Sequence, residues 1–343
     1  MPVVDFGVGL APTEPLKKIA WIARTAEVLG FKYIVHADQR FRGEKDVFVT
    51  LTSDALSTEK IMLGPCISDP YSRIPGMLAT AIASLDEVSG GRAILTLGVG
   101  GSGFEELHIA REHPNTAVRE AFQIVRGLLR GEEVTFKGRM FQVTKARMNF
   151  ECKRDIPMFI ASRSPMNLEL AGELADGALL ASYASEEQLR YAIGRVEAGA
   201  KKSGRALSDL KLIAWLYASI SEDSATAVAN VRPFVTQALL NTSPEMYPVM
   251  FRGFDQDVTS FILDCRRTGG RSRANEDRKY LTDEVIRRFS VAGTPEECIA
   301  KLRAVAALGI DTIWLRPFSA PFSESNHEKV IIPFAEKVLP YVR

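Results

Sequence analysis

The sequence predicts a (β/α)8 TIM barrel, a single domain over residues 1–343 with two insertions. Three observations lead to this fold class. Short apolar stretches rich in β-branched residues alternate with segments of helical periodicity along almost the whole chain. Strands separated by helices pair in parallel, because each helix returns the chain to the edge where the next strand begins. The predicted strands are evenly spaced and no dinucleotide-binding motif opens the chain, which disfavours an open doubly wound sheet.

Four strand–helix units fill the first 130 residues. Apolar positions from Leu16 to Leu29 recur at helical spacing, and Gly30 closes that helix. The stretch Ile61–Ile67 is short, apolar and bounded by turn residues, as expected of a strand buried on both faces. The predicted strands are 3–9, 33–36, 61–67 and 93–97, and the helices that follow them are 15–29, 47–56, 75–88 and 115–129.

Two segments interrupt the alternation. Residues 131–145 alternate in polarity around Lys137-Gly138, which predicts a β-hairpin insertion. Residues 241–288 are long, charged and irregular, which is typical of a lid, an oligomer contact or a partly disordered segment. Their basic cluster at 266–273 is expected to be solvated surface. The remaining strands are predicted at 157–161, 177–181, 210–218 and 311–316, with helices at 166–174 and 185–200 and one that Thr294 caps and Pro295 begins.

Composition and charge argue against several classes of function. The 43 basic and 42 acidic side chains give a formal net charge of +1, which disfavours a nucleic-acid partner or a membrane surface. No signal sequence and no apolar run of about 18 residues occurs, so we expect an unexported, cytoplasmic protein. The four cysteines show no C-x-x-C spacing and no neighbouring histidine cluster, so neither a zinc site nor a disulfide framework is predicted.

Candidate reacting groups follow the predicted strands, because barrel enzymes bind their ligands at the carboxyl ends of the strands. Asp38 follows the second strand and Glu105 lies in the glycine-rich stretch after the fourth. Both suit proton transfer or substrate orientation, and each could equally be a surface carboxylate. His36 ends an apolar strand, where a histidine is more often a hydrogen-bonded structural residue. No histidine spacing predicts a metal site.

Two other stretches suit a flat ligand or an anion. The glycines at 98, 100 and 103 would let a cofactor or a phosphate approach the backbone closely, although a plain glycine-rich turn is an equally good interpretation. The segment Ser162–Pro165 begins a helix with small polar residues. Such a helix N-terminus can bind an anion, and simple capping by Ser164 is the alternative.

Motifs spread over nearly the whole chain carry a family resemblance. They are Ala37-Asp38, Gly64 to Pro75, Leu85 to Ala93, the glycines at 98, 100 and 103, Ile160 to Pro165, Leu170 to Gly177 and Val291 to Glu297. Together they resemble the bacterial-luciferase-like superfamily, and within it the coenzyme F420-dependent oxidoreductases such as the methylenetetrahydromethanopterin reductases. The resemblance implies hydride transfer between C5 of the deazaflavin F420 and a small-molecule substrate, with Asp38 or Glu105 assisting any proton transfer. It also implies a homodimer.

The resemblance further implies a set of cofactor contacts. The implied cofactor-binding residues are Asp38, Cys66, Ile67, Ser68, Asp69, Ser102, Gly103, Arg163, Ser164, Met166 and Asn167. A non-prolyl cis peptide bond, most naturally Cys66–Ile67, would bulge against the deazaflavin face. Asp38 and Asp69 would touch the ring system, and residues 163–167 would hold the cofactor phosphate. This last contact favours the anion interpretation of 162–165 over simple capping.

Two other functions can use the same barrel. One is a monooxygenase that uses reduced FMN and O2, and the other is a non-catalytic carrier of a flavin or deazaflavin. Two positions depart from the F420-dependent enzymes that the chain resembles. Gln39 stands where the glucose-6-phosphate enzymes carry a histidine, and Gly9-Leu10 stands where the methanopterin reductases usually carry a glutamate. The substrate and the direction of transfer are therefore left open.

Overall fold

The computed structural model of the chain describes residues 4–39, 44–101, 103–150, 152, 154–181, 184–242, 244–253, 256–268, 279–319 and 327–342. The strands are β1 (Asp5–Leu10), β2 (Tyr33–His36), β3 (Met62–Pro65), β4 (Leu95–Leu97), β5 (Val134–Lys137), β6 (Gln142–Ala146), β7 (Met158–Ser162), β8 (Gly177–Ala181), β9 (Lys211–Ile220), β10 (Val291–Gly293) and β11 (Thr312–Pro317). The helices are α1 (Leu16–Val28), α2 (Val47–Ser57), α3 (Pro75–Val88), α4 (Pro114–Leu129), α5 (Pro165–Leu174), α6 (Glu186–Lys202), α7 (Ser224–Leu240), α8 (Tyr247–Met250), α9 (Gln256–Thr268), α11 (Asp283–Arg288), α12 (Pro295–Ala306) and α13 (Glu328–Lys337).

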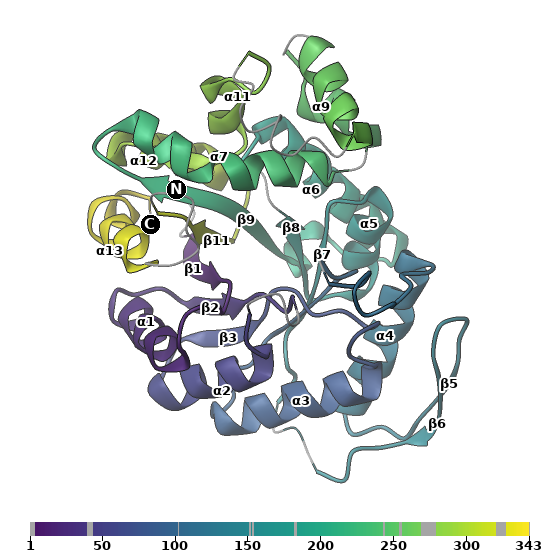
Figure 1. The fold of residues 1–343 in the computed structure, drawn as a ribbon. Coiled ribbons are helices and arrows are strands. Elements are labelled where there is room, and N and C mark those ends of the chain that lie inside the picture. Colours follow the sequence, from purple (N-terminus) through teal and green to yellow (C-terminus); the bar gives the residue numbers. More distant parts are fainter. Residues whose placement is uncertain are drawn as a thin grey trace. The chain divides into compact units, whose positions relative to one another are not determined.

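Parallel strands form a nearly closed barrel (Figure 1). Within the described residues, eight of them follow one another in the order β3-β2-β1-β11-β9-β8-β7-β4. Parallel bridges from Leu63 to Ala93 and from Ser68 to Leu97 join β3 to β4. The short strand β10, which the sequence pattern did not predict, pairs with β9. The predicted (β/α)8 fold class is confirmed.

The chain divides into two compact units. One comprises Gly7–Leu179 and Arg195–Lys211, and the other comprises Met1–Phe6, Leu180–Gly194 and Leu212–Arg343. The first unit contains β2, β3, β4 and β7 with helices α1 to α5. All the residues predicted to bind the cofactor lie in the first unit, so its loops carry the candidate site.

Two charged side chains of the first unit fasten the start of β3. The Glu27 carboxylate accepts hydrogen bonds of 2.6–3.1 Å from the backbone N–H groups of residues 59–61. Burial opposes ionisation of Glu27, but these N–H groups outweigh it and lower the pKa of the carboxyl. Arg92 donates to the Ile61 carbonyl group (3.0 Å) just before β3, and to those of Ala55 and Thr58. These contacts fix where β3 enters the barrel and therefore where its carboxyl end emerges.

The structure contains the predicted β-hairpin, and its status as an insertion stays a prediction. β5 and β6 pair in antiparallel fashion and extend away from α4 in Figure 1. Glu120 of α4 is buried, and its carboxylate accepts hydrogen bonds from the backbone N–H groups of residues 139–141 at 2.7–2.9 Å. The Glu120 carboxylate thus attaches the turn of the hairpin to the helix.

The long charged segment at 241–288 differs from the expectation. Its described part is largely helical, forming α8, α9 and α11, and it is not irregular. Tyr247, Phe261 and Ile286 from this segment lie in one buried apolar cluster with Val231 and other residues of α7. Charged residues between short helices obscured the apolar periodicity in the sequence. Residues 269–273 of the basic cluster lie outside the described residues.

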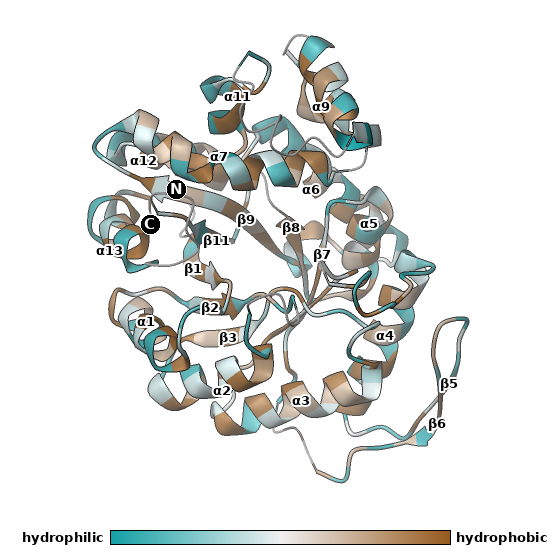
Figure 2. Cartoon of the chain, in the orientation of Figure 1, coloured by the Kyte–Doolittle hydropathy of each residue, from teal (hydrophilic) through white to brown (hydrophobic). Residues whose placement is uncertain are grey.

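Hydropathy along the helices is mixed (Figure 2). In α4 the buried positions Val118, Phe122 and Val125 recur at helical spacing, whereas Gln123 in the helix and Arg130 just after it are exposed.

Among the described helices, none combines the length and apolar character needed to cross a membrane.

Candidate active site

Four loops leave the same end of the parallel strands in the first unit. His36 at the end of β2 pairs in register with Pro65 at the end of β3, and β4 pairs with β7. Backbone hydrogen bonds continue this pairing beyond the strands, from Cys66 N–H to His36 O (2.7 Å) and from Ser68 N–H to Thr96 O (3.0 Å). Because the strands are parallel, the loops that carry the predicted site residues all begin at their carboxyl ends.

Asp38 lies buried at the start of the loop after β2, with 4% of its surface exposed. Its Oδ2 accepts hydrogen bonds from the Ser68 hydroxyl (2.8 Å) and from Arg73 Nε (2.7 Å). Its Oδ1 accepts from Arg73 Nη2 (3.1 Å). The structure therefore brings together Asp38 and Ser68, two of the residues predicted to bind the cofactor.

Sequence reasoning assigned no role to Arg73, although it noted the motif that contains it. The same Nη2 that contacts Asp38 also donates to Asp46 Oδ2 (2.7 Å), and the guanidinium carbon lies 5.0 Å from the centre of the Phe48 ring. Burial disfavours the charged guanidinium, but its hydrogen bonds and ion pairs with Asp38 and Asp46 outweigh burial and raise the pKa of Arg73. Arg73 is therefore a permanent cation held between two carboxylates.

Asp69 organises the loop that follows β3. Its Oδ1 accepts from the backbone N–H groups of Tyr71 (2.9 Å) and Ser72 (2.8 Å), and its Oδ2 accepts from the Ser72 hydroxyl (2.8 Å). The side chain is fully buried. Asp69 therefore shapes its own loop, and its contact with a cofactor ring stays a prediction.

The peptide bond between Cys66 and Ile67 is cis, as the resemblance implied. The Ile67 side chain packs against Gly98 in the loop after β4. A Cβ at position 98 would lie 2.5 Å from Ile67 Cδ1 and 3.1 Å from the backbone oxygen of Ala161. Position 98 therefore requires glycine for close packing, whereas a Cβ at Gly101 would come no nearer than 4.0 Å to Gln39 Cγ.

The rest of the glycine-rich loop departs in part from the sequence expectation. Gly103 and Phe104 are buried, and the Phe104 ring meets Tyr71 edge-on with 6.0 Å between ring centres. Glu105 is exposed on the following turn, and its carbonyl group accepts a hydrogen bond from His108 N–H. No contact in the described residues joins Glu105 to Asp38, so a catalytic role for Glu105 stays a prediction. Ser102 lies outside the described residues.

Helix α5 begins at Pro165 without a side-chain cap. Ser164 is its N-cap residue, but the Ser164 hydroxyl accepts no hydrogen bond from the helix, so the simple capping interpretation is wrong. The Ser164 N–H instead donates to Ser162 Oγ (2.9 Å). Asn167 is buried and accepts a hydrogen bond from Asn115 Nδ2 (2.7 Å). A phosphate contact by Arg163, Ser164, Met166 and Asn167 stays a prediction.

A family model described as luciferase-like monooxygenase matches residues 3–312. The chain belongs to the luciferase-like monooxygenase family. It is 35% identical over 312 residues to the 5,10-methylenetetrahydromethanopterin reductase of Methanolobus tindarius, covering 90% of this chain and 93% of that protein. It is 31% identical over 301 residues to the F420-dependent glucose-6-phosphate dehydrogenase of Beutenbergia cavernae, covering 85% and 82%.

A solved structure supports the same family assignment. The coenzyme F420-dependent tetrahydromethanopterin reductase from Methanopyrus kandleri is 27% identical to this luciferase-like protein and aligns with a TM-score of 0.86 over 99% of each chain. The resemblance read from the sequence motifs is therefore confirmed at the level of the family and its barrel.

His36 of this luciferase-like barrel has a structural role, as its position predicted. The side chain is fully buried at the end of β2, and Nε2 lies 2.5 Å from Oδ2 of the equally buried Asp54 on α2. This pair fastens α2 to the strand that presents Asp38.

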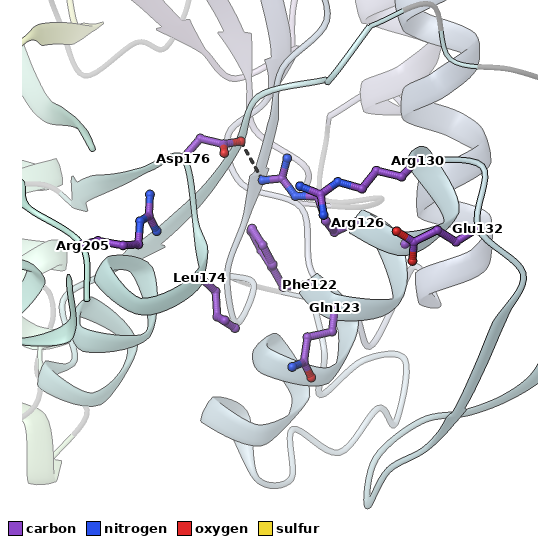
Figure 3. Close-up of a pocket in the computed structure, with 9 residues that line it drawn as sticks. Phe122, Gln123, Arg126, Arg130, Glu132, Leu174, Asp176 and Arg205 are labelled. Atoms are coloured by element: carbon purple, nitrogen blue, oxygen red, sulfur yellow. Dashed lines mark hydrogen bonds and ion pairs between the residues drawn. The ribbon is translucent and has the colours of Figure 1, made fainter. Parts of the chain in front are cut away.

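A cavity of about 450 Å³ lies near the amino end of β8 (Figure 3). It is lined by Phe122, Gln123, Arg126, Gly127, Arg130, Glu132, Leu174, Asp176 and Arg205. Arg126 forms an ion pair with Asp176 (2.7 Å), and Arg205 donates to the carbonyl groups of Gly172 and Ala175 at the end of α5. These contacts stabilise the ends of α4 and α5. TIM-barrel enzymes bind their ligands at the carboxyl ends of the strands, so this cavity does not coincide with the predicted site.

Proposed function

We propose that this protein is a coenzyme F420-dependent oxidoreductase that transfers hydride between the deazaflavin and a small organic substrate. The observation that carries the proposal is the 35% identity, over 90% of the chain, to a methylenetetrahydromethanopterin reductase. Bound F420 would supply the redox chemistry, and the protein would bind and orient cofactor and substrate. A substrate of the methylenetetrahydropterin class follows from the same similarity.

The described residues fit such a cofactor. Asp38 presents a buried carboxylate at the carboxyl end of β2, and the backbone of Gly101 has open space beside Gln39. The uncapped start of α5 offers backbone N–H groups and the positive end of a helix dipole, which suits a phosphate. In this proposal Asp38 and residues 66–69 contact the ring system, Ser102 and Gly103 lie near it, and the phosphate is held by Arg163, Ser164, Met166 and Asn167.

The decisive experiment is equilibrium titration of the purified protein with F420 and, separately, with FMN, followed by fluorescence. We expect micromolar or tighter binding of F420 and much weaker binding of FMN. The reverse preference would favour an FMN-dependent monooxygenase. Binding of neither would refute a flavin or deazaflavin site, and F420 binding without turnover of pterins, alcohols or ketones would support a carrier.

Two variants test the proposed phosphate contact. Arg163→Ala should weaken F420 binding because it removes a cation beside the start of α5. Arg190→Ala is the matched control, since Arg190 is an exposed arginine that pairs with Glu186, four residues away on α6. Equal F420 affinities of the two variants would contradict the phosphate assignment.

We also propose that the protein is a homodimer whose interface is the outer face of α1, α2 and α3, which contact one another in sequence. Large apolar side chains are exposed there at spacings that place them on one face of each helix. They are Trp21 and Val28 on α1, Val49 and Leu56 on α2, and Met77 and Val88 on α3. Val28 and Leu56 are 79% and 72% exposed, which is unusual for a surface that stays in water.

The oligomeric state tests this interface directly. Leu56→Asp should convert a dimer into a monomer, as measured by light scattering after size-exclusion chromatography, because it introduces a charge into an apolar contact. Phe150→Asp is the control, since Phe150 is an exposed apolar residue outside these helices. A wild-type monomer, or a Leu56→Asp dimer as stable as wild type, would contradict the proposal.

A further inference from the structure

Arg73 connects both ends of the loop between β2 and α2. Asp38 begins this loop, and Asp46 ends it by accepting hydrogen bonds from the backbone N–H groups of Phe48 and Val49 at the start of α2. Arg73 reaches both carboxylates from the neighbouring loop between β3 and α3. One guanidinium group therefore fixes Asp38 relative to the rigid start of a helix.

The hydrogen bonds of Asp38 leave one acceptor position open. A carboxylate offers about four lone-pair positions, two on each oxygen. Ser68 and Arg73 Nε occupy both positions on Oδ2, and Arg73 Nη2 occupies one on Oδ1. These are the only hydrogen bonds of Asp38 within the described part of the chain. One position on Oδ1 therefore accepts no hydrogen bond from the described residues.

We propose that Arg73 is a positioning residue for cofactor recognition, which presents Oδ1 of Asp38 as the acceptor for one N–H or O–H donor of the bound deazaflavin cofactor. This inference rests on the proposed function and extends it. A two-point pair with a guanidinium fixes the plane of the carboxylate. Asp38 then orients the cofactor by accepting a hydrogen bond.

The role requires the guanidinium shape and not charge alone. Nε and Nη2 contact different oxygens of Asp38, while Nη2 also contacts Asp46. A lysine ammonium is a single-point cation on a flexible stem and cannot reproduce this planar fork. Arg73→Lys should therefore keep the charge and lose the orientation of the Asp38 carboxylate.

The experiment compares F420 dissociation constants, measured by fluorescence titration, for wild type, Arg73→Lys, Arg73→Ala, Asp38→Asn and the Arg73→Ala/Asp38→Asn double variant. We expect Arg73→Ala to weaken binding by roughly 10- to 100-fold, as is usual for losing hydrogen bonds to a charged group, with Arg73→Lys between it and wild type. If Arg73 acts through Asp38, the double variant should bind F420 no more weakly than the single variant that has the lower F420 affinity.

Added guanidinium ion supplies a readout that a merely structural role would not move. Millimolar guanidinium chloride should restore part of the F420 affinity of Arg73→Ala and none of that of the double variant. If Arg73→Ala does not fold, the same measurements are made on Asp46→Asn. Asparagine can still cap α2 but loses the ion pair with Arg73, so we expect a severalfold loss of F420 affinity.

Two results would overturn the inference. The first is that Arg73→Lys binds F420 within twofold of the wild-type affinity, and that Arg73→Ala (or Asp46→Asn in its place) does so as well. The other is a set of losses for Arg73→Ala and Asp38→Asn that multiply in the double variant, because independent effects mean that Arg73 does not act through Asp38. Wild-type protein that binds no F420 would instead refute the proposed function itself.

Discussion

The close packing of Gly98 against Ile67 makes the Gly98→Ala variant a quantitative test of the site geometry. The added Cβ would lie 2.5 Å from Ile67 Cδ1 and 3.1 Å from the backbone oxygen of Ala161, and the first distance is shorter than real Cβ contacts. Ile67 must therefore leave its position. Adding a carbon to a filled site destabilises a protein by about 1–3 kcal/mol.

Gly101→Ala is the matched control within the same loop. Its Cβ would come no closer than 4.0 Å to another atom, that of Gln39 Cγ. Both substitutions restrict the unfolded chain equally, a stabilisation of about 0.4–1 kcal/mol that cancels when the two variants are compared. We expect the free energy of unfolding in urea to be lower for Gly98→Ala than for Gly101→Ala by about 1–3 kcal/mol.

A second substitution tests the cause of this difference. Ile67→Val removes Cδ1, and on its own it should cost about 0.5–1.5 kcal/mol. In the Gly98→Ala background it also removes the shortest contact, so the double variant should be more stable than the sum of the two single effects predicts. Equal stabilities of Gly98→Ala and Gly101→Ala, or strictly additive effects with Ile67→Val, would refute the packing argument.

Other parts of the chain give three more tests. Backbone N–H groups lower the pKa of the Glu27 carboxyl despite its burial. The ionised Glu27 therefore stabilises the fold above the ordinary pKa of 4.5, and this stabilisation is lost as the pH falls through the lowered pKa. Glu27→Gln should cost about 1–2 kcal/mol in urea unfolding at pH 7 and less at acid pH, and an equal cost at both would contradict this. Glu120→Ala should free the hairpin and speed tryptic cleavage after Arg139, which is already exposed in the folded protein, and cleavage no faster than in wild type would show that other contacts hold the hairpin. Burial raises the pKa of the Cys298 thiol to about 12. At pH 8 this thiol should therefore react with a disulfide reagent only after the protein unfolds, and the partly exposed Cys152 should react first.

That the loops with the candidate site residues share one end of the sheet could be predicted, because it depends on chain direction. Strands that alternate with helices run parallel, so the loops that follow them leave one end of the sheet. The pairing of β2 with β3 and the bridge from Ser68 to Leu97 place Asp38 and residues 66–69 there, as the sequence indicated. The hairpin at β5 and β6 was predictable for a similar reason, since alternation around a turn is a local signal.

Several features of the site could not be predicted, because they depend on distances between loops that are far apart in the sequence. Glu105 lies in the loop after β4, a sequence position that suits a catalytic role, and its side chain is exposed. Ser164 has the residue type of a helix cap, yet its hydroxyl makes no cap. For Ser164 the residue type was right for a cap and the backbone geometry of the loop decided otherwise, whereas a catalytic role for Glu105 stays a prediction.

By itself, the sequence determined the eight strands of the barrel and the loops that follow them, because hydrophobic periodicity and turn residues act over a few neighbouring positions. Only the tertiary structure decided which polar groups meet. Arg73 contacts Asp38 from 35 residues away and Asp46 from 27 residues away. Those contacts arise when strand pairing brings separate loops to one edge and burial makes an unpaired charge costly, and no local pattern encodes them.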